Sequence, residues 1–427
     1  MSSTSPTTPL AWPDFPAQED PVETLIKLSR YYGSDPAFVL AGGGNTSVKI
    51  GDRLYVKASG TALATIKRSG FVILDRQQLA QIAEADFGTE VESREAQYKT
   101  AIMNARLELP DGGGTGPRPS VESLLHHLVP RRFVVHTHAT VINALTCSIH
   151  GAQLAREWFG DTCLWVEFVD PGYTLGRVLK ENLAYYQTRH QAGGKNAAPS
   201  PKVILMANHG MIVAGDTPAE VRTHTADIVA CVTAKLGGGE EWQTAAWGTS
   251  PRARRPNTGE LQHALESALR SHLAEPLAEA APPVMVFDDS PLVSAFVNSE
   301  SGPKTAALGP LNPDQIVYCT SFPLWFVPRA GEASEAIITR LRTQLAAHKH
   351  QYKYDPRIVL VQGLGLFAIG ENYQTALTAL QLYCDTIQVM SGALQLGGVQ
   401  PLSAAKRAFI ENWEVEAYRR QIARKAL

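Results

Sequence analysis

The sequence predicts an α/β protein built from two compact units. Short apolar runs such as residues 133–135 and 203–206 alternate with longer amphipathic stretches such as residues 22–32, which is the pattern of strands and helices in turn. A length of 427 residues is too great for one ordinary hydrophobic core. We expect a disordered or docked tail at 1–20, a first domain at 21–248, an Arg- and Pro-rich linker at 249–260 and a second domain at 261–427.

The composition is that of an ordinary globular protein, with 44% hydrophobic and 19% charged residues. The balance of 39 basic against 41 acidic residues argues against nucleic acid as the main partner. No apolar run approaches the roughly twenty residues of a membrane helix, and no signal peptide is evident, so a cytoplasmic protein without a membrane partner is expected. The five cysteines are odd in number and contain no CxxC pair, so a bound metal would need histidines and carboxylates.

In the first 110 residues, helices and strands are predicted in turn around a tight turn at residues 42–45, which contain three glycines. The stretch 22–32 predicts a helix. The predicted strands are 38–40, 54–56 and 71–74, and a second helix is predicted at 92–107.

The middle of the chain predicts a helix at 120–127, which Ser120 can cap, and then a buried strand from 133 that includes His136-Thr137-His138. A further strand at 203–206 leads into Asn208-His209-Gly210 and returns at 211–213. The helix 218–236 closes the first domain.

The second domain weakly repeats the first. Residues 201–210 align without gaps with residues 356–365, and each copy continues through a second strand into a helix. Residues 130–138 align in the same way with residues 313–321, where every histidine is lost. Two apolar strands can also match by chance, and we favour duplication over that alternative.

His136 and His138 form the first candidate metal-binding pair. Side chains at i and i+2 of a strand point to the same face, so both imidazoles can bind one ion. His209 lies where a strand ends at a glycine and can supply a third nitrogen, which leaves a coordination position for substrate, as in catalytic zinc sites. A single strand histidine is more often a packed core residue, and only the spacing and the glycine favour a metal here.

Glu122 is the candidate acid or base, because a helix N-terminus and a nearby cation both favour its charged form. Spacing alone favours a simpler interpretation, a surface carboxylate that interacts with the helix dipole.

Two further segments, residues 42–47 and 58–61, offer backbone N–H groups together with hydroxyl or amide donors, which a phosphate needs. An ordinary turn would have the same pattern of residues. A competing signal is the GxGxxA pattern at residues 363–368, with Asp385 about twenty residues later, which would make the chain a dehydrogenase. Gly370 interrupts the helix that such a turn must open, and the match to the His209 segment explains these glycines better.

Together these residues resemble the class II aldolase and adducin family, in particular its rhamnulose-1-phosphate aldolase-like members, in which such a unit often precedes a short-chain dehydrogenase. The resemblance covers about residues 21–245, and the segment around residues 361–367 is also similar to those longer proteins. Its carriers are Gly-Gly-Gly-Asn-Thr-Ser-Val-Lys (42–49), Val-Lys-Ala-Ser-Gly-Thr (56–61), Arg-Pro-Ser-Val-Glu (118–122), His-Thr-His-Ala (136–139) and Asn-His-Gly (208–210).

The resemblance implies a three-layer α/β/α fold with a mostly antiparallel central sheet, and the internal repeat predicts a degenerate second aldolase-like half after it. The resemblance also implies a homo-oligomer that cleaves a ketose 1-phosphate into dihydroxyacetone phosphate and an aldehyde through a metal-stabilised enediolate. Zn²⁺ or another divalent transition metal would be held by His136, His138 and His209, and Glu122 would be the acid/base. The sugar phosphate would be held by residues in or beside the matching motifs: Gly44, Asn45, Ser47, Ser59, Gly60 and Ser120.

Other functions stay open on the same fold. Sugar-phosphate epimerases and decarboxylases share the ligands, and adducin-like members are non-catalytic interaction proteins; the three histidines and Glu122 favour the aldolase. If the second half is a decayed copy, the alignment places Cys319, Ser321 and Leu364 at its ligand positions. We therefore expect it to bind no catalytic metal.

Overall fold

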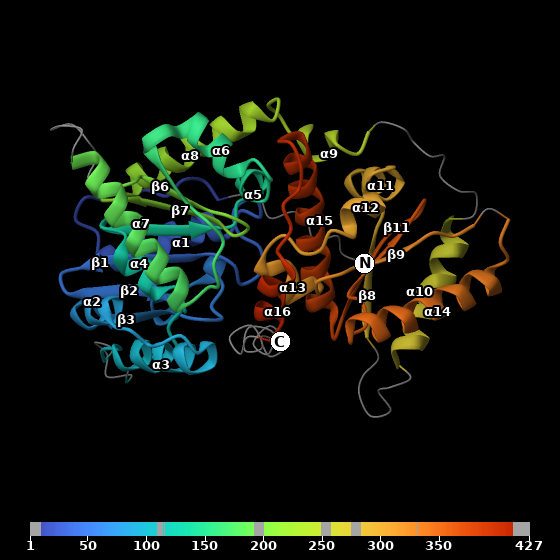
Figure 1. The fold of residues 1–427 in the computed structure, drawn as a ribbon, viewed down its shortest axis with the longest axis horizontal. Coiled ribbons are helices and arrows are strands. Elements are labelled where there is room, and N and C mark those ends of the chain that lie inside the picture. The colour runs from blue at the N-terminus through green and yellow to red at the C-terminus, as the bar shows by residue number, and fades with distance from the viewer. Residues whose placement is uncertain are drawn as a thin grey trace. The chain divides into compact units, whose positions relative to one another are not determined.

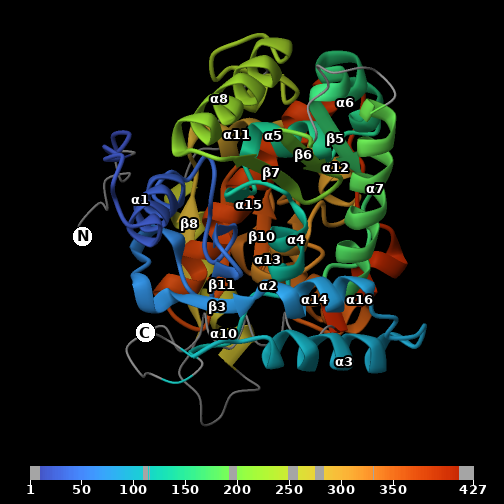
Figure 2. The same ribbon diagram turned by 90° about the vertical axis from the view of Figure 1, so that its left-hand side faces the viewer.

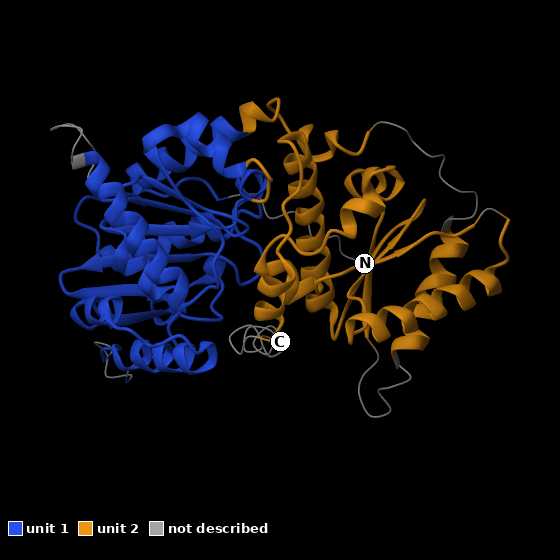
Figure 3. Ribbon diagram, viewed as in Figure 1, with its two compact units in different colours: residues 1–146, 151–232 blue, residues 147–150, 233–427 orange. Residues whose placement is uncertain are grey.

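The computed structural model describes residues 10–108, 114, 116–191, 200–248, 258–274, 283–329 and 331–412. Residues 1–9 of the expected tail and residues 249–257 of the expected linker lie outside this part of the chain. The chain divides into unit 1, residues 1–146 and 151–232, and unit 2, residues 147–150 and 233–427 (Figure 3). Each unit is built around its own sheet.

Unit 1 contains a seven-stranded sheet in the order β3-β2-β1-β4-β7-β6-β5. All neighbouring strands are antiparallel except β5 and β6, which run parallel, so the mostly antiparallel sheet is confirmed. The strands are β1 (Asn45–Ile50), β2 (Arg53–Lys57), β3 (Phe71–Asp75), β4 (Phe133–Thr137), β5 (Cys163–Val166), β6 (Val203–Met206) and β7 (Gly210–Gly215).

Helices cover both faces of this sheet, as the three-layer prediction requires. On one face α4 and α7 pack their leucines on Val134, Ile204 and Ile212. On the other face α1 contacts β1, where the hydroxyl groups of Ser29 and Thr46 lie 2.7 Å apart. The helices α2 and α3 lie at the β3 end of the sheet (Figure 1 and Figure 2). The helices of unit 1 are α1 (Pro21–Gly33), α2 (Arg76–Glu84), α3 (Val91–Asn104), α4 (Ser123–Leu128), α5 (Thr140–Thr146), α6 (Gly151–Phe159), α7 (Tyr173–Gln191) and α8 (Pro218–Lys235).

The described end of the tail packs against unit 1. The ring of Trp12 meets Tyr31 of α1 edge-on at 4.8 Å, and the guanidinium of Arg222 of α8 lies 4.9 Å from the Trp12 ring centroid. Aromatic contacts of this kind stabilise the docked arrangement of this segment.

Unit 2 contains a four-stranded sheet in the order β8-β11-β10-β9, with β9 and β10 parallel and the other pairs antiparallel. Its strands are β8 (Val284–Asp288), β9 (Leu324–Phe326), β10 (Ile358–Val361) and β11 (Gly365–Gly370). Its helices are α9 (Trp242–Ala245), α10 (Thr258–Ala274), α11 (Pro291–Asn298), α12 (Gly302–Ala306), α13 (Pro313–Cys319), α14 (Ser334–Tyr352), α15 (Tyr373–Gln395) and α16 (Ala404–Asn412).

The boundary between the units precedes the expected linker. Ser391 of α15 donates a hydrogen bond of 2.7 Å to the carbonyl oxygen of Trp242, and the Trp247 ring packs edge-on against Phe296 at 4.7 Å. Because both tryptophans are buried against unit 2, the chain joins that unit soon after α8.

Two local expectations fail, and one competing signal is excluded as the sequence analysis favoured. Residues 38–40 form no strand, because the amides of Phe38 and Val39 donate to the carbonyl oxygen of Asp35 and close a turn there. The helix expected at 120–127 begins at Ser123. The GxGxxA pattern forms the turn of the β10–β11 hairpin, so it opens no helix and cannot be a dinucleotide turn.

The predicted strand at residues 313–321 is also wrong, because residues 313–319 form the helix α13. Asn312 caps it by accepting a hydrogen bond of 2.9 Å from the amide of Gln315, and Pro313 occupies the first turn. These two helix-start signals outweigh the apolar run that follows them. Cys319 and Ser321 are therefore not the counterparts of His136 and His138. That position in unit 2 belongs to β8.

Two further findings concern the whole described part. Its five cysteines form no disulfide. Within the described residues, no helix combines the length and the apolar character needed to cross a membrane.

Candidate metal centre and active site

The end of β4 and the β6–β7 turn bring the three predicted histidines together. In the β4–β7 ladder His136 pairs with Ile212 and Thr137 with Met211. His209 lies in the turn just before β7, where its amide donates to the carbonyl oxygen of Met206. A Cβ atom at Gly210 would lie 2.4 Å from the carbonyl oxygen of Thr137, so only glycine lets the turn approach β4 this closely.

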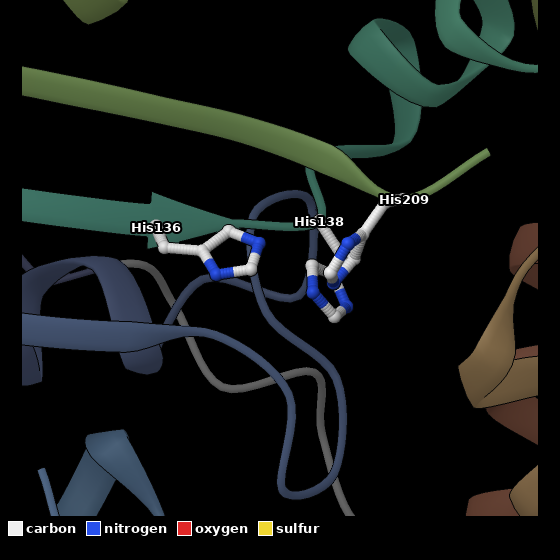
Figure 4. A group of neighbouring side chains, drawn as sticks. All are labelled: His136, His138 and His209. Atoms are coloured by element: carbon white, nitrogen blue, oxygen red, sulfur yellow. The ribbon is translucent and has the colours of Figure 1, made fainter. Parts of the chain in front are cut away.

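The three imidazoles converge on one point (Figure 4). The ring centroids are 4.9 Å apart for His136 and His138, 4.9 Å for His136 and His209, and 5.2 Å for His138 and His209. One ring nitrogen from each lies within 4.8 Å of the others, which is a spacing that one ion can bridge.

The group fits a divalent transition metal. The Nε2 atom of His136 is buried and has no hydrogen-bond partner among the described residues, which is costly for a polar atom unless a ligand satisfies it. Burial lowers the pKa of His136 to about 4 despite the opposing charge of Glu122, so the ring is neutral at pH 7, as a metal ligand must be. Three imidazoles are a donor set that suits catalytic zinc, whose fourth position is taken by water or substrate.

Glu122 lies between two of these histidines. Its Oε2 is 3.2 Å from Nδ1 of His136, and its Oε1 is 3.3 Å from Nε2 of His209. Burial raises the pKa of Glu122, but its interactions with His136 and His209, hydrogen bonds included, outweigh burial and hold the pKa well below its usual value. Glu122 is 6% exposed, so it is not the surface carboxylate that spacing alone favoured.

Neighbouring hydrogen bonds fix the backbone around Glu122. The amide of Glu122 donates to the Ser120 hydroxyl at 3.2 Å, and the Ser123 hydroxyl donates to the Ser120 carbonyl at 2.7 Å. The hydroxyl of Tyr98 donates to the carbonyl oxygen of Val121 at 3.0 Å. These bonds restrain the backbone just before and just after Glu122 and so help to position its carboxylate.

The glycine-rich turn before β1 is held by a buried lysine. Nζ of Lys57 donates to the carbonyl oxygens of Gly42 at 3.0 Å and Gly44 at 2.8 Å. Gly44 has a φ of +69°, and a Cβ there would lie 3.0 Å from the carbonyl oxygen of His136. Asn45 pairs with His136 in the β1–β4 ladder. Gly44 and Asn45 thus lie beside the histidine cluster.

The second loop lies next to the segment that carries Glu122. The amide of Ser59 donates to the carbonyl oxygen of Arg118 at 2.9 Å, and Ala58 forms an isolated bridge with Pro119. Ser59, Gly60 and Ser120 therefore gather at one place. Ser47 does not join them, because it is fully buried under α4 with its hydroxyl 2.8 Å from Nδ1 of His126.

Sequence reasoning missed three supporting residues: Tyr98, His126 and Lys57. A lysine within an apolar strand could have identified Lys57, since a buried ammonium needs acceptors. For Tyr98 and His126 no signal exists in the sequence, because their partners are distant in the chain.

Comparison with known proteins identifies the family of the chain. A family model described as the class II aldolase and adducin N-terminal domain matches residues 23–236, and a model described as the second domain of class II aldolase matches residues 260–419. The chain belongs to the class II aldolase and adducin family. The class II aldolases of this family generally depend on a divalent metal, bind sugar phosphates and commonly form oligomers.

Individual relatives are distant. An uncharacterized oxidoreductase of Bacillus subtilis, YuxG, is 25% identical over 431 residues, which cover 94% of this chain and 58% of that protein. The chain thus spans little more than half the length of that relative. The N-terminal class II aldolase domain of a conserved Thermoplasma acidophilum protein is 26% identical with a TM-score of 0.42, covering 53% of this chain and 97% of that one. A sugar-phosphate aldolase from Thermotoga maritima is 14% identical with a TM-score of 0.35, covering 54% and 99%.

Proposed function

We propose that this chain is a zinc-dependent aldolase that cleaves a ketose 1-phosphate of the rhamnulose or fuculose type into dihydroxyacetone phosphate and an aldehyde. The observation that carries the proposal is the buried carboxylate of Glu122, whose two oxygens lie within 3.3 Å of two members of a convergent histidine triad. Membership of the family supports an enzyme of this class.

His136, His138 and His209 are the proposed metal ligands. A zinc ion held there supplies Lewis-acid polarisation of the substrate carbonyl next to the bond that breaks. The position of Glu122 beside this group lets it contact the same part of the substrate.

Glu122 is the proposed acid/base. When the carbon–carbon bond breaks, the neighbouring hydroxyl group loses its proton and becomes the aldehyde carbonyl, and the electron pair of the bond passes into the enediolate of dihydroxyacetone phosphate. Glu122, a buried carboxylate whose pKa is held low, takes up the hydroxyl proton and then delivers a proton to the carbon that lost the bond; in the reverse direction it removes the proton from that carbon.

The phosphate is proposed to bind between the two loops, at the backbone of Gly44, Ser59 and Gly60 with the side chains of Asn45 and Ser120. Lys57 supports this subsite, because its ammonium group fixes the carbonyl groups of Gly42 and Gly44 in the first loop. Ser47 serves there as a buried support through His126.

The test combines metal analysis with a cleavage screen of ketose 1-phosphates, in which dihydroxyacetone phosphate is measured. Wild type should contain zinc and release the product. His138→Ala should lose both zinc and cleavage, whereas Glu122→Gln should keep zinc and lose about 10²- to 10⁴-fold in rate, the usual share of a general acid/base. His350→Ala, an exposed histidine of α14, is the matched control.

Two outcomes contradict the proposal. Equal cleavage by wild type, His138→Ala and Glu122→Gln would remove the site assignment. Conversion of a sugar phosphate without release of dihydroxyacetone phosphate would instead support an epimerase or a decarboxylase.

A further inference from the structure

The β10–β11 hairpin of unit 2 reproduces the β6–β7 hairpin of unit 1 in detail. The amide of His209 donates to Met206 at 3.2 Å, and the amide of Leu364 donates to Val361 at 3.0 Å. A Cβ at Gly210 would lie 2.4 Å from the carbonyl oxygen of Thr137, and a Cβ at Gly365 would lie 2.5 Å from that of Asp288. The same close approach of a turn to a neighbouring strand therefore occurs in both units.

The neighbouring strands also correspond, residue by residue. In unit 1, β4 pairs with β7 from Phe133–Gly215 to Thr137–Met211. In unit 2, β8 pairs with β11 from Val284–Gly370 to Asp288–Leu366. Since the two hairpins align at every position, β8 takes the place of β4 along its whole length.

The parallel strand on the other side of each hairpin gives an independent match. Trp165 of β5 and Trp325 of β9 pair with equivalent positions of their hairpins. A Cβ at Gly151 would lie 2.5 Å from the Leu145 carbonyl oxygen and 2.8 Å from the Trp165 ring. A Cβ at Gly302 would lie 2.5 Å from the Phe296 carbonyl oxygen and 2.8 Å from the Trp325 ring.

The helices follow in the same order. The helices and strands of the two units correspond one to one in chain order, apart from α13, which is an addition in unit 2. The order in unit 1 is α4, β4, α5, α6, β5, α7, β6, β7, α8, and the order in unit 2 is α10, β8, α11, α12, β9, α14, β10, β11, α15. Leucines of α4 and α7 cover one face of the first sheet, and leucines of α10 and α14 cover the equivalent face of the second. The sheet positions in these cores also coincide: Val166, Ile204, Met206, Ile212 and Ala214 in unit 1 match Phe326, Val359, Val361, Phe367 and Ile369 in unit 2.

We propose that unit 2 is a duplicate of the α4–α8 part of unit 1 whose metal site has become a packing site, with Phe287, Asp289 and Leu364 at the positions of His136, His138 and His209. This inference rests on the proposed function only for the choice of ligand positions. Two of the three replacements are apolar. Leu364 belongs to the α10–α14 core, and Phe287 packs against it and meets the Phe367 ring at 4.8 Å.

The described residues of unit 2 also lack the other half of the proposed active site. Among them no strand pairs with the second edge of β8, whereas β1 occupies that edge of β4 in unit 1. The turn before β1 and the loop after β2, which carry the proposed phosphate subsite, therefore have no counterpart in this described part. The chain is expected to hold a single metal ion, in unit 1.

Asp289 is exposed and is itself a residue type that binds zinc, so two substitutions should rebuild the site. The experiment starts from the full chain with His138→Ala and His209→Ala, which should bind no zinc. Adding Phe287→His and Leu364→His should restore zinc binding with a single ion per chain and raise the unfolding temperature when zinc is present. The matched control adds Val286→His and Leu364→His, because Val286 points to the opposite face of β8 and should restore nothing.

Zinc binding by neither or by both of these folded variants would overturn the residue assignment, as would zinc retained by the starting variant. Wild type without zinc contradicts the proposed function alone, because the comparison of the two rebuilt variants stands without it.

A second measurement covers the case in which the new histidines unfold unit 2. Gly365→Ala should lower the unfolding temperature as Gly210→Ala does, while Gly259→Ala, in open space on α10, should not. If Gly365→Ala is as harmless as Gly259→Ala, the equivalence of the turns is wrong.

Discussion

At the scale of single residues, the site depends on polar groups that are buried and individually supported. Glu122 is held by two histidines at its carboxylate and by Ser120 at its amide. Tyr98 adds a bond to the preceding carbonyl group, that of Val121. Removing such a support should move the carboxylate without removing the metal ligands.

Tyr98→Phe tests this support. The ring stays in its buried cluster, but the Val121 carbonyl loses its donor, at a cost of about 1–3 kcal/mol. We expect kcat to fall by about tenfold with little change in KM, because the carboxylate acts on bound substrate. Zinc content should not change. Tyr185→Phe, at an exposed tyrosine, is the control, and an equal kcat for both variants would contradict a positioning role.

His126 predicts a pH dependence of stability. Burial lowers its pKa to about 3, so the folded protein keeps this ring neutral while the unfolded chain protonates it near pH 6.5. Unfolding therefore takes up a proton between about pH 6.5 and pH 3, and stability falls as the pH falls through this range.

His126→Asn keeps an amide partner for Ser47 but removes this proton. In urea titrations the free energy of unfolding of His126→Asn should fall less steeply on acidification than that of wild type, by about 1.4 kcal/mol per pH unit near pH 5. An unchanged slope would show that His126 is not buried in its neutral form.

At the scale of elements, the sequence predicted what depends on local pattern and failed where partners are distant. The strands around His136 and the β6–β7 hairpin follow from apolar runs and glycines, and both were confirmed. The candidate site residues could be chosen from the sequence because each lies in a short contiguous motif. The burial of Glu122 and the role of Lys57 could not, since both depend on contacts across the sheet.

The helix α13 shows how a local signal was overlooked. Its apolar residues 316–318 were interpreted as a strand, although Asn312 and Pro313 form a helix start. The counterpart of β4 was therefore predicted at residues 313–321, about thirty residues after β8, the strand that occupies this position in the structure.

Asn312→Ala should destabilise the protein by about 1 kcal/mol, the usual value of an N-cap, because the amide of Gln315 loses its acceptor. Asn312→Asp retains an acceptor and should lie within a few tenths of a kcal/mol of wild type. Chemical unfolding measures both. Equal stability of Asn312→Ala and wild type would contradict the capping role.

At the scale of the whole molecule, the two units have different roles. Unit 1 carries the histidines, the carboxylate and the two loops, whereas the same positions in unit 2 are used for packing under α10 and α14. Changes in the α10–α14 core should therefore affect stability and leave the composition of the metal site intact.

Leu341→Ala, in the middle of α14, should cost about 2–5 kcal/mol, because it removes a fully buried side chain from this core. The zinc content of the folded fraction should equal that of wild type. Leu308→Ala, at an exposed leucine, is the control. Loss of zinc from folded Leu341→Ala would contradict the division of roles.

The central claim is that His136, His138 and His209 bind the catalytic metal, and X-ray absorption spectroscopy at the zinc edge of the purified protein tests it most directly. We predict three imidazole nitrogens at about 2.0–2.1 Å and no sulfur ligand in wild type, and loss of the zinc signal in His138→Ala. Sulfur in the coordination shell, or a zinc spectrum unchanged by His138→Ala, would contradict this claim.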